Sequence, residues 1–250
     1  MSIAQQYNFI GDFGIARWRA WSPGIRTNDD WLKWLDGAQD TPPDDQPDVS
    51  FLPALLRRRL DRYGRMALHT AWPCSQGETS VQTVFASRHG ALNRTMELLG
   101  ALARDETLSP TLFTLSVHNS VAGLLSIARK DRGAATAMAA GPDTLILSLL
   151  EGATMLQEGA TRVLVIYVDD SMPEVYASQT ASAPNRAFAV ALLLTPVAES
   201  PLHCRLTGLR ESLRPRHAPE VELMEFLLGR IGCAEFGAHQ SWRLERRHAG

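Results

Sequence analysis

The chain has 250 residues, of which 45% are hydrophobic and 21% charged, and its formal net charge is −2 at pH 7. These proportions are those of an ordinary globular protein with enough apolar residues for one large domain or two small ones. The near-neutral charge gives no general attraction to nucleic acid or to an anionic membrane.

Targeting and metal-binding signals are both missing from the sequence. The N-terminus does not combine positive charge with an apolar stretch, and the apolar runs are shorter than the roughly 18 residues that span a bilayer. Cys74, Cys204 and Cys233 are odd in number and far apart, which matches neither a disulfide framework nor a metal-ligand spacing. We therefore expect a cytoplasmic protein with no membrane span, no metal and no cofactor.

The first elements are predicted from local patterns. Residues 7–17 mix aromatic and β-branched residues with glycine, which predicts an opening strand with a tight bend. Thr27 or Asn28 is expected to cap a short helix. Residues 40–50 are rich in Asp and Pro and predict a surface loop, and apolar residues at helical spacing predict one helix over 52–72.

From residue 81 onward, predicted strands and helices alternate. The strands are expected at 81–86, 133–137, 162–169, 187–195 and 204–209. The helices are expected at 89–104, 119–128, 143–158 and 219–231, and residues 112–117 are expected to be extended or mixed. This alternation predicts a layered α/β fold with a partly parallel sheet.

The segment 136–141, Thr-Ala-Met-Ala-Ala-Gly, stands where a short strand of small residues meets a long apolar helix. A strand, a sharp turn and a helix N-terminus together form the geometry with which enzymes present an activated Cys or Ser. Here the residue on the turn is Met138, whose thioether has no proton to lose and forms no acyl-enzyme. Plain packing in a buried turn is the alternative interpretation.

Several segments, taken in order, resemble the N-terminal half of the β-ketoacyl synthases of the thiolase-like superfamily. An arginine-rich early helix carries Arg58, Arg59, Asp61, Arg62 and Met66. A serine- and asparagine-led helix carries Ser116, Asn119, Ala122, Gly123 and Ile127. The strand and nucleophile elbow at 133–141, the helix at 145–159 and the strand at 163–168 follow, so that the resemblance covers about residues 7–196.

The resemblance implies a thiolase-like layered fold with a mixed sheet covered by helices, and it also exposes two departures. Met138 stands at the position that matches the nucleophilic cysteine. The sequence ends at Gly250, whereas the family's catalytic histidines lie in a second, C-terminal half. We therefore expect residues 1–250 to form a single N-terminal ketosynthase domain that does not itself catalyse condensation.

Among the relatives, the chain resembles most the minimal chain-length-factor subunits of bacterial aryl polyene clusters. This resemblance implies a heterodimer in which a complete ketosynthase supplies every catalytic group and this chain closes the acyl tunnel. An acyl carrier protein and a growing acyl or polyene chain would be the other partners. Two alternatives remain open: a cysteine-less relative acting as a decarboxylase or acyl-binding enzyme, and a homodimeric module that docks carrier proteins.

The resemblance also assigns roles to individual residues. The strand leading to the elbow pairs across the dimer axis in this superfamily, which would place Ala134, Ala135, Thr136, Ala137 and Met138 at the interface. Pocket or tunnel residues would be Phe113, Leu92 and Met96, for which ordinary core packing is the alternative.

Charged residues complete the set of candidates. Arg58, Arg59 and Arg62 would attract an acidic carrier protein, the alternative being a solvated helix face paired with Asp61. The basic clusters lack interleaved aromatic residues, which disfavours nucleic acid. The pair Asp169 and Asp170 stands at a strand end, where it could bind a cation, but we expect solvated loop carboxylates because these are far commoner.

Overall fold

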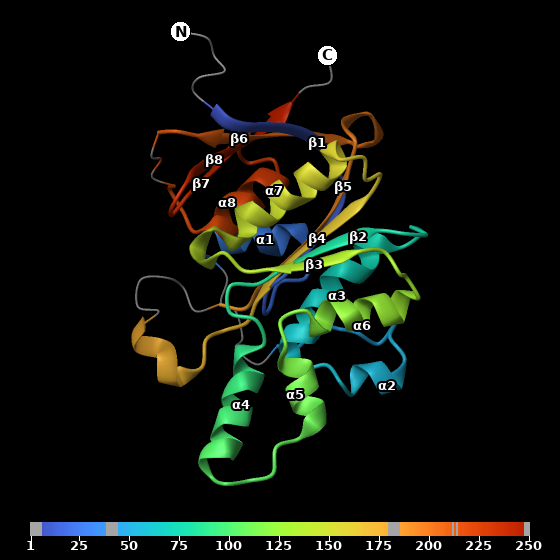
Figure 1. Ribbon diagram of the computed structural model, residues 1–250. Coiled ribbons are helices and arrows are strands. Elements are labelled where there is room, and N and C mark those ends of the chain that lie inside the picture. The colour runs from blue at the N-terminus through green and yellow to red at the C-terminus, as the bar shows by residue number, and fades with distance from the viewer. Residues whose placement is uncertain (1–6, 39–44, 180–185, 212, 214, 248–250) are drawn as a thin grey trace.

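An eight-stranded mixed sheet crosses the molecule in the order β3-β2-β4-β5-β1-β6-β8-β7 (Figure 1). The computed structural model describes residues 7–38, 45–179, 186–211, 213 and 215–247. The strands are β1 (Tyr7–Trp21), β2 (Gln82–Ala86), β3 (Ala135–Met138), β4 (Val163–Asp169), β5 (Phe188–Thr195), β6 (Leu202–Leu209), β7 (Cys233–Phe236) and β8 (Ser241–Arg247). Strand β2 pairs in parallel with β3 and β4, and the other pairs are antiparallel.

Helices cover both faces of this sheet. Their bounds are α1 (Asn28–Leu35), α2 (Ala54–Arg57), α3 (Arg62–Ser75), α4 (Leu92–Ala103), α5 (Pro110–Ser116), α6 (Ser120–Arg129), α7 (Thr144–Gln157) and α8 (Pro219–Leu227). One face packs against α7, α8 and α1, and the other against α3 and α6. The mixed sheet between helical layers confirms the predicted layered α/β architecture.

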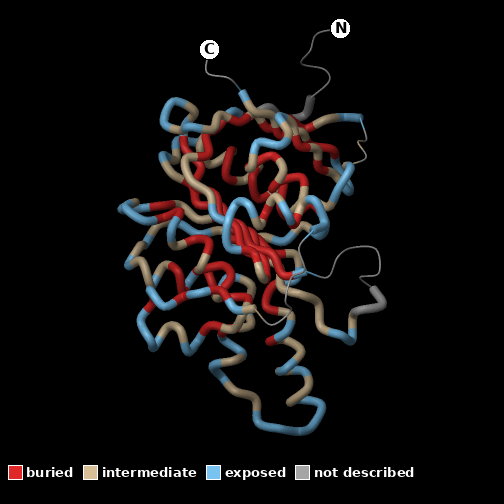
Figure 2. The backbone as a smooth tube through the Cα atoms, turned by 180° about the vertical axis from the view of Figure 1, so that it is seen from behind, coloured by how far each residue is buried: buried red, intermediate tan, exposed pale blue. Residues whose placement is uncertain are grey.

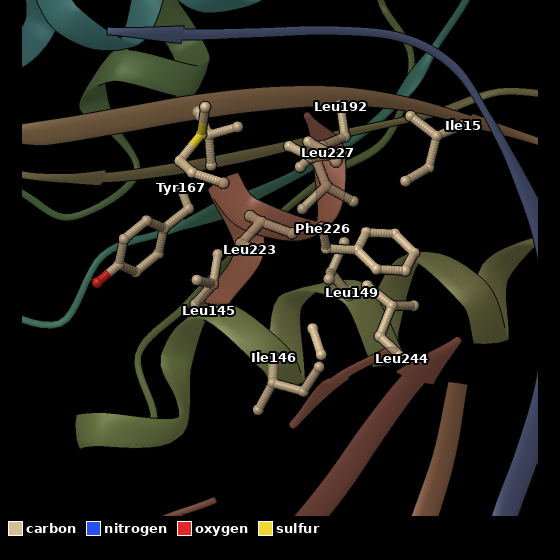
Figure 3. Packing of buried hydrophobic residues seen from close by; sticks show 14 of the residues in the cluster. Ile15, Leu145, Ile146, Leu149, Tyr167, Leu192, Leu223, Phe226, Leu227 and Leu244 are labelled. Atoms are coloured by element: carbon tan, nitrogen blue, oxygen red, sulfur yellow. The ribbon is translucent and has the colours of Figure 1, made fainter. Parts of the chain in front are cut away.

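The central strands β4 and β5 separate two apolar cores. Because successive side chains of a strand point to opposite faces, Val165 and Tyr167 enter the core on the α7 side, and Leu164 and Ile166 enter the core on the α3 side. Figure 2 shows this burial concentrated along the sheet, and Figure 3 shows apolar side chains of α7 and α8 converging on the α7 side. A strand buried on both faces reads as a continuous apolar run, which is why both strands were predictable.

The predicted helix over 52–72 is wrong as a single element. The chain forms the short helix α2, breaks, and begins α3 at Arg62. Asp61 is extended and accepts a hydrogen bond from the Gly64 amide at 2.9 Å, so it caps α3. An N-terminal aspartate cap competes with helix continuation, and it overrides the helical spacing of the leucines.

Residues 112–116 are helical and only Val117 is extended, which corrects the expectation of an extended or mixed segment over 112–117. Ser109 caps α5 by accepting the Leu112 amide at 3.3 Å, and Pro110 occupies the first turn. A serine followed by proline is a helix-start signal. Figure 1 shows α4 and α5 extending together away from the sheet.

Other differences lie near the chain's loops and its C-terminal part. The sequence did not predict β7 and β8, which extend the sheet beyond β6. The helix expected over 219–231 ends earlier, at Leu227. Residues 39–44 lie outside the described residues, so the predicted loop over 40–50 is seen only from Asp45, which accepts the Gly24 amide at 2.7 Å.

Within the described ranges no single helix is long and apolar enough to cross a membrane, although α5 and α6, bent by 95°, pass that test as a pair.

Two helical glycines provide a matched test of how closely α7 approaches the sheet. A Cβ at Gly152 in α7 would lie 2.8 Å from both Leu194 Cδ1 and Val165 Cγ2, whereas one at Gly123 in α6 would meet nothing within 4 Å. We expect Gly152→Ala to lower the free energy of unfolding by about 1–3 kcal/mol. Gly123→Ala should raise it by about 0.5–1 kcal/mol, because alanine favours the helix. Urea unfolding of both variants measures this, and equal stabilities would contradict the close packing.

Candidate functional site

The elbow predicted from the sequence forms at the carboxyl ends of the parallel strands. Met138 ends β3 and is in register with Ala86 of β2, which is in register with Tyr167 of β4. Residues opposite one another in neighbouring strands share a face, so the three side chains lie on the α7 side. Met138 is partly buried and packs against the apolar core there.

The turn after Met138 depends on a glycine and a threonine. Gly141 has a φ of +56°, in the left-handed region that side chains with a Cβ rarely adopt. The Thr144 hydroxyl accepts the Ala140 amide at 2.9 Å and donates to the Gly141 carbonyl at 2.7 Å. The first residue of α7 therefore closes the turn from which the helix starts.

Asp143 attaches the elbow to the connection between β7 and β8. Its buried carboxylate accepts the Ala238 amide at 2.8 Å and the His239 amide at 3.0 Å. The His239 ring nitrogen Nδ1 lies 3.1 Å from the same carboxylate. The partners are 95 and 96 residues away in the sequence, so nothing in the local pattern indicated this role.

The strand β3 forms one edge of the sheet and pairs only with β2 among the described residues. Ala134, which precedes β3, and Ala135 and Ala137 within it are exposed, whereas Thr136 and Met138 are partly buried. The Ser87 amide donates to the Met138 carbonyl at 3.2 Å on the paired side. The outer side presents backbone groups next to small side chains, which leaves room for another strand.

A polar network lies beside the elbow, at the ends of β2 and β4. Asp169 accepts the Ser87 hydroxyl, the Arg88 amide and the Tyr167 hydroxyl, each at 2.8 Å. The Tyr167 hydroxyl also lies 3.0 Å from a Glu220 oxygen at the start of α8. Burial raises the pKa of Tyr167 well above its ordinary value and also raises the pKa of Glu220. The expectation that Asp169 is a solvated loop carboxylate is therefore wrong.

A cavity of about 250 Å³ opens on the α3 side of the same strand ends, between the loops after β2 and β4. Asp170 lines this cavity and forms an ion pair with Arg62, whose Nη2 lies 3.0 Å from the Asp170 Oδ1. Burial raises the pKa of the Asp170 carboxyl, and Arg62 opposes that shift. Asp170 is thus also enclosed, contrary to the expectation of a solvated loop carboxylate.

The candidate pocket residues lie on the projecting helices. Leu92 lines the cavity on the α3 side and Met96 is partly buried one turn later, both in α4. Phe113 in α5 is 62% exposed. Met138, by contrast, packs on the α7 side. Met138 and the three residues on α4 and α5 therefore do not line one pocket within the described chain. That they line one pocket in a complex stays a prediction.

The arginines predicted to act together are divided by the break before α3. Arg58 and Arg59 are exposed in that break. Arg62 is partly buried and bound to Asp170, and it donates to the Ser171 hydroxyl at 3.3 Å. Only the first two thus present their charges openly to solvent.

The arrangement offers no thiol at the elbow. Cys74 lies in α3 and Cys204 in β6, and burial raises the pKa of each thiol to about 12. The third cysteine, Cys233, lies in β7 at the opposite edge of the sheet from β3. The described residues contain no group of three or more side chains suited to hold a metal ion. What the elbow does present is a methionine beside an open strand edge.

Residues 31–230 match the family model described as the β-ketoacyl synthase, N-terminal domain. Among solved structures, a chain of the ketosynthase (ApeO) in complex with its chain length factor (ApeC) from Xenorhabdus doucetiae is 28% identical, with a TM-score of 0.78. That alignment covers 94% of this chain and 99% of the other. No curated protein matches significantly.

Two more distant structures share the fold. The ishigamide ketosynthase/chain length factor is 17% identical with a TM-score of 0.60, over 76% of this chain and 64% of that one. The AntDE:AntF complex, a type II polyketide acyl carrier protein with its ketosynthase, is 11% identical with a TM-score of 0.60, over 75% and 63%.

The Asp143 bonds predict a measurable contribution to stability. Asp143→Ala removes a buried carboxylate that accepts the Ala238 and His239 amides, and the loss of these bonds to a charged group should cost about 1–3 kcal/mol in the free energy of unfolding. Asp143→Asn keeps one acceptor oxygen and should lose less. As a control, Asp36→Ala breaks an exposed ion pair with Arg230 and should cost at most about 1 kcal/mol. Chemical denaturation compares the three, and a loss no larger for Asp143→Ala than for the control would contradict the anchoring role.

Proposed function

The chain belongs to the family of β-ketoacyl synthase N-terminal domains, and we propose that it is a non-catalytic, chain-length-factor-like subunit that pairs with a complete ketosynthase. The observation that carries this proposal is the open edge strand β3, which ends on Met138 where the fold presents a nucleophile. The similarity over 99% of a chain from a ketosynthase–chain length factor complex supports it.

The chemistry of the elbow supports a non-catalytic role. Acyl transfer by this fold needs a nucleophile at the end of β3, and a methionine sulfur has no proton to give up. The thiols of Cys74 and Cys204 are buried and held protonated on other elements. In the proposed complex, the partner ketosynthase therefore carries the condensation chemistry.

The edge of β3 supports pairing with a partner chain. An exposed edge strand attracts other strands, and its exposed alanines, Ala135 and Ala137, let another backbone approach closely. We infer that β3 pairs across the subunit interface and that residues 134–138 form its centre. Met138 would then stand at the wall between the two subunits.

The projecting pair α4 and α5 supplies an apolar surface for the same interface. Four large side chains of this region are unusually exposed: Leu99, Leu102, Phe113 and Val117. Large exposed apolar side chains are stabilised when a partner covers them. We infer that Phe113, together with Leu92 and Met96, closes the partner's acyl tunnel and limits the length of a fatty-acid- or polyketide-type product, such as an aryl polyene.

Co-expression with the full-length ketosynthases of the source organism tests the pairing. We expect the two to co-purify as a heterodimer, and Ala137→Arg to weaken it at least tenfold, which corresponds to about 1.4 kcal/mol. Ala198→Arg places the same side chain at an exposed position next to β6 and should leave the complex intact.

A well-folded monomer that captures no ketosynthase would overturn the proposal. A stable homodimer would favour a carrier-docking module, and carbon dioxide released from malonyl carrier protein by this chain alone would favour an enzyme.

Carrier-protein docking is proposed for the exposed arginines. Acidic carrier proteins are attracted by unpaired surface cations, and Arg58 and Arg59 present such charges. Reversing both, with Arg58→Glu and Arg59→Glu, should lower the association rate of the carrier with the complex by about tenfold at low salt and reduce its salt dependence. Lys33→Glu combined with Lys130→Glu, two exposed reversals on α1 and at the end of α6, is the matched control because it changes the net charge by the same amount. Surface plasmon resonance at two salt concentrations measures both, and equal effects would assign the attraction to net charge alone.

A further inference from the structure

The buried network at the start of α8 has one hydroxyl proton for two carboxyl groups. The Tyr167 hydroxyl lies 2.8 Å from an oxygen of Asp169 and 3.0 Å from an oxygen of Glu220. A phenol can donate to only one of them. The second short contact is therefore a hydrogen bond only if one carboxyl group itself carries a proton.

The surroundings decide which carboxyl holds that proton. Asp169 accepts two further hydrogen bonds, from the Ser87 hydroxyl and the Arg88 amide, so its carboxyl group already serves as an acceptor. Burial raises the pKa of Glu220, and the nearby negative charge of Asp169 adds to that shift. The bonds therefore run in one direction, from the Glu220 carboxyl to Tyr167 and from Tyr167 to Asp169.

The groups that oppose protonation are few. The hydrogen bond from the Glu220 backbone amide lowers the pKa of the Glu220 carboxyl. The contact with Tyr167 and the charge of Arg88, in the loop after β2, lower it as well. The N-terminus of α8 also favours a negative charge at this position. Among the described residues, Tyr167, Asp169 and Arg88 are the ionisable side chains with the largest effects on the Glu220 carboxyl.

We propose that Glu220 and Tyr167 form a proton-dependent latch, in which a protonated Glu220 fastens the start of α8 to the carboxyl end of β4. Tyr167 is buried, with 1% of its surface exposed, and Figure 3 shows its hydroxyl directed away from the apolar cluster. Loss of the proton places two anionic carboxylates on either side of one hydroxyl and weakens this attachment. Ser87 connects the latch to the elbow: its hydroxyl donates a hydrogen bond to Asp169, and its amide donates one to the Met138 carbonyl.

The sign of the pH dependence follows from proton linkage. An unfolded glutamate releases its proton near its ordinary pKa of about 4.3, whereas the folded chain holds it to higher pH. Between these two values the folded state binds more protons, so this group makes stability fall as the pH rises. Above the folded pKa its contribution becomes constant. The proposal does not depend on whether the chain pairs with a ketosynthase.

The variant Glu220→Gln tests the latch, because its amide donates to the Tyr167 oxygen at every pH. In urea unfolding of the full chain, we expect its midpoint to match the wild type near the ordinary glutamate pKa of about 4.3 and to exceed it increasingly as the pH rises, until the folded Glu220 carboxyl has lost its proton. Glu225→Gln is the control on the same helix: Glu225 lies 3.8 Å from Arg230 and should show no such gain at high pH. A Glu220→Gln midpoint that follows the wild type at every pH, or falls below it at high pH, would overturn the proposal.

Infrared spectroscopy separates proton storage from simple packing. At a pH just above the ordinary glutamate pKa of about 4.3, the wild type should show the carbonyl stretch of a protonated carboxylic acid that Glu220→Gln lacks. Tyr167→Phe should shift this band, because the acid loses its acceptor. An identical carboxylic-acid band in wild type and Glu220→Gln would show that Glu220 is ionised, and the latch would be rejected.

Discussion

The parallel pairing of β2 with β3 on one side and β4 on the other is the constraint on which the rest of the molecule depends. It places three carboxyl ends side by side and aligns Met138, Ala86 and Tyr167 in one row. The loops after such strands meet at one edge of a sheet, which is where α/β proteins build their sites. The elbow, the cavity and the polar network all follow from this register.

Contacts distant in sequence hold that edge in place. Asp143 joins the turn to the connection between β7 and β8, and Glu220 meets Tyr167 from the start of α8. Residues from 220 onward thus anchor an elbow that forms about 80 to 100 residues earlier in the chain. The other side of the elbow, the outer edge of β3, has no such support among the described residues. The elbow is thus anchored on its inner side and open at its outer edge. In the proposed complex, the open edge pairs with the ketosynthase.

The strengths and failures of the sequence-based predictions have physical causes. The strands β4 and β5 were predictable because burial on both faces demands continuous apolar runs. The break at Asp61 was missed because the spacing of the preceding leucines is the same in one helix as in two, and a single hydrogen bond to Gly64 decides between them. Arg62 was grouped with Arg58 and Arg59 because neighbours on a helix look alike in sequence, although Asp170 binds only one of them.

By itself, the sequence determined that Met138 lies where a short strand meets an apolar helix, and that a thioether at this position starts no acyl transfer. These are local properties, set by residue type and by spacing of a few residues. Only the tertiary structure decided that β3 is an edge, that Phe113 is exposed, and that Glu220 meets the Tyr167 hydroxyl. Such facts depend on which elements become neighbours, and the chain settles that through contacts between residues tens of positions apart.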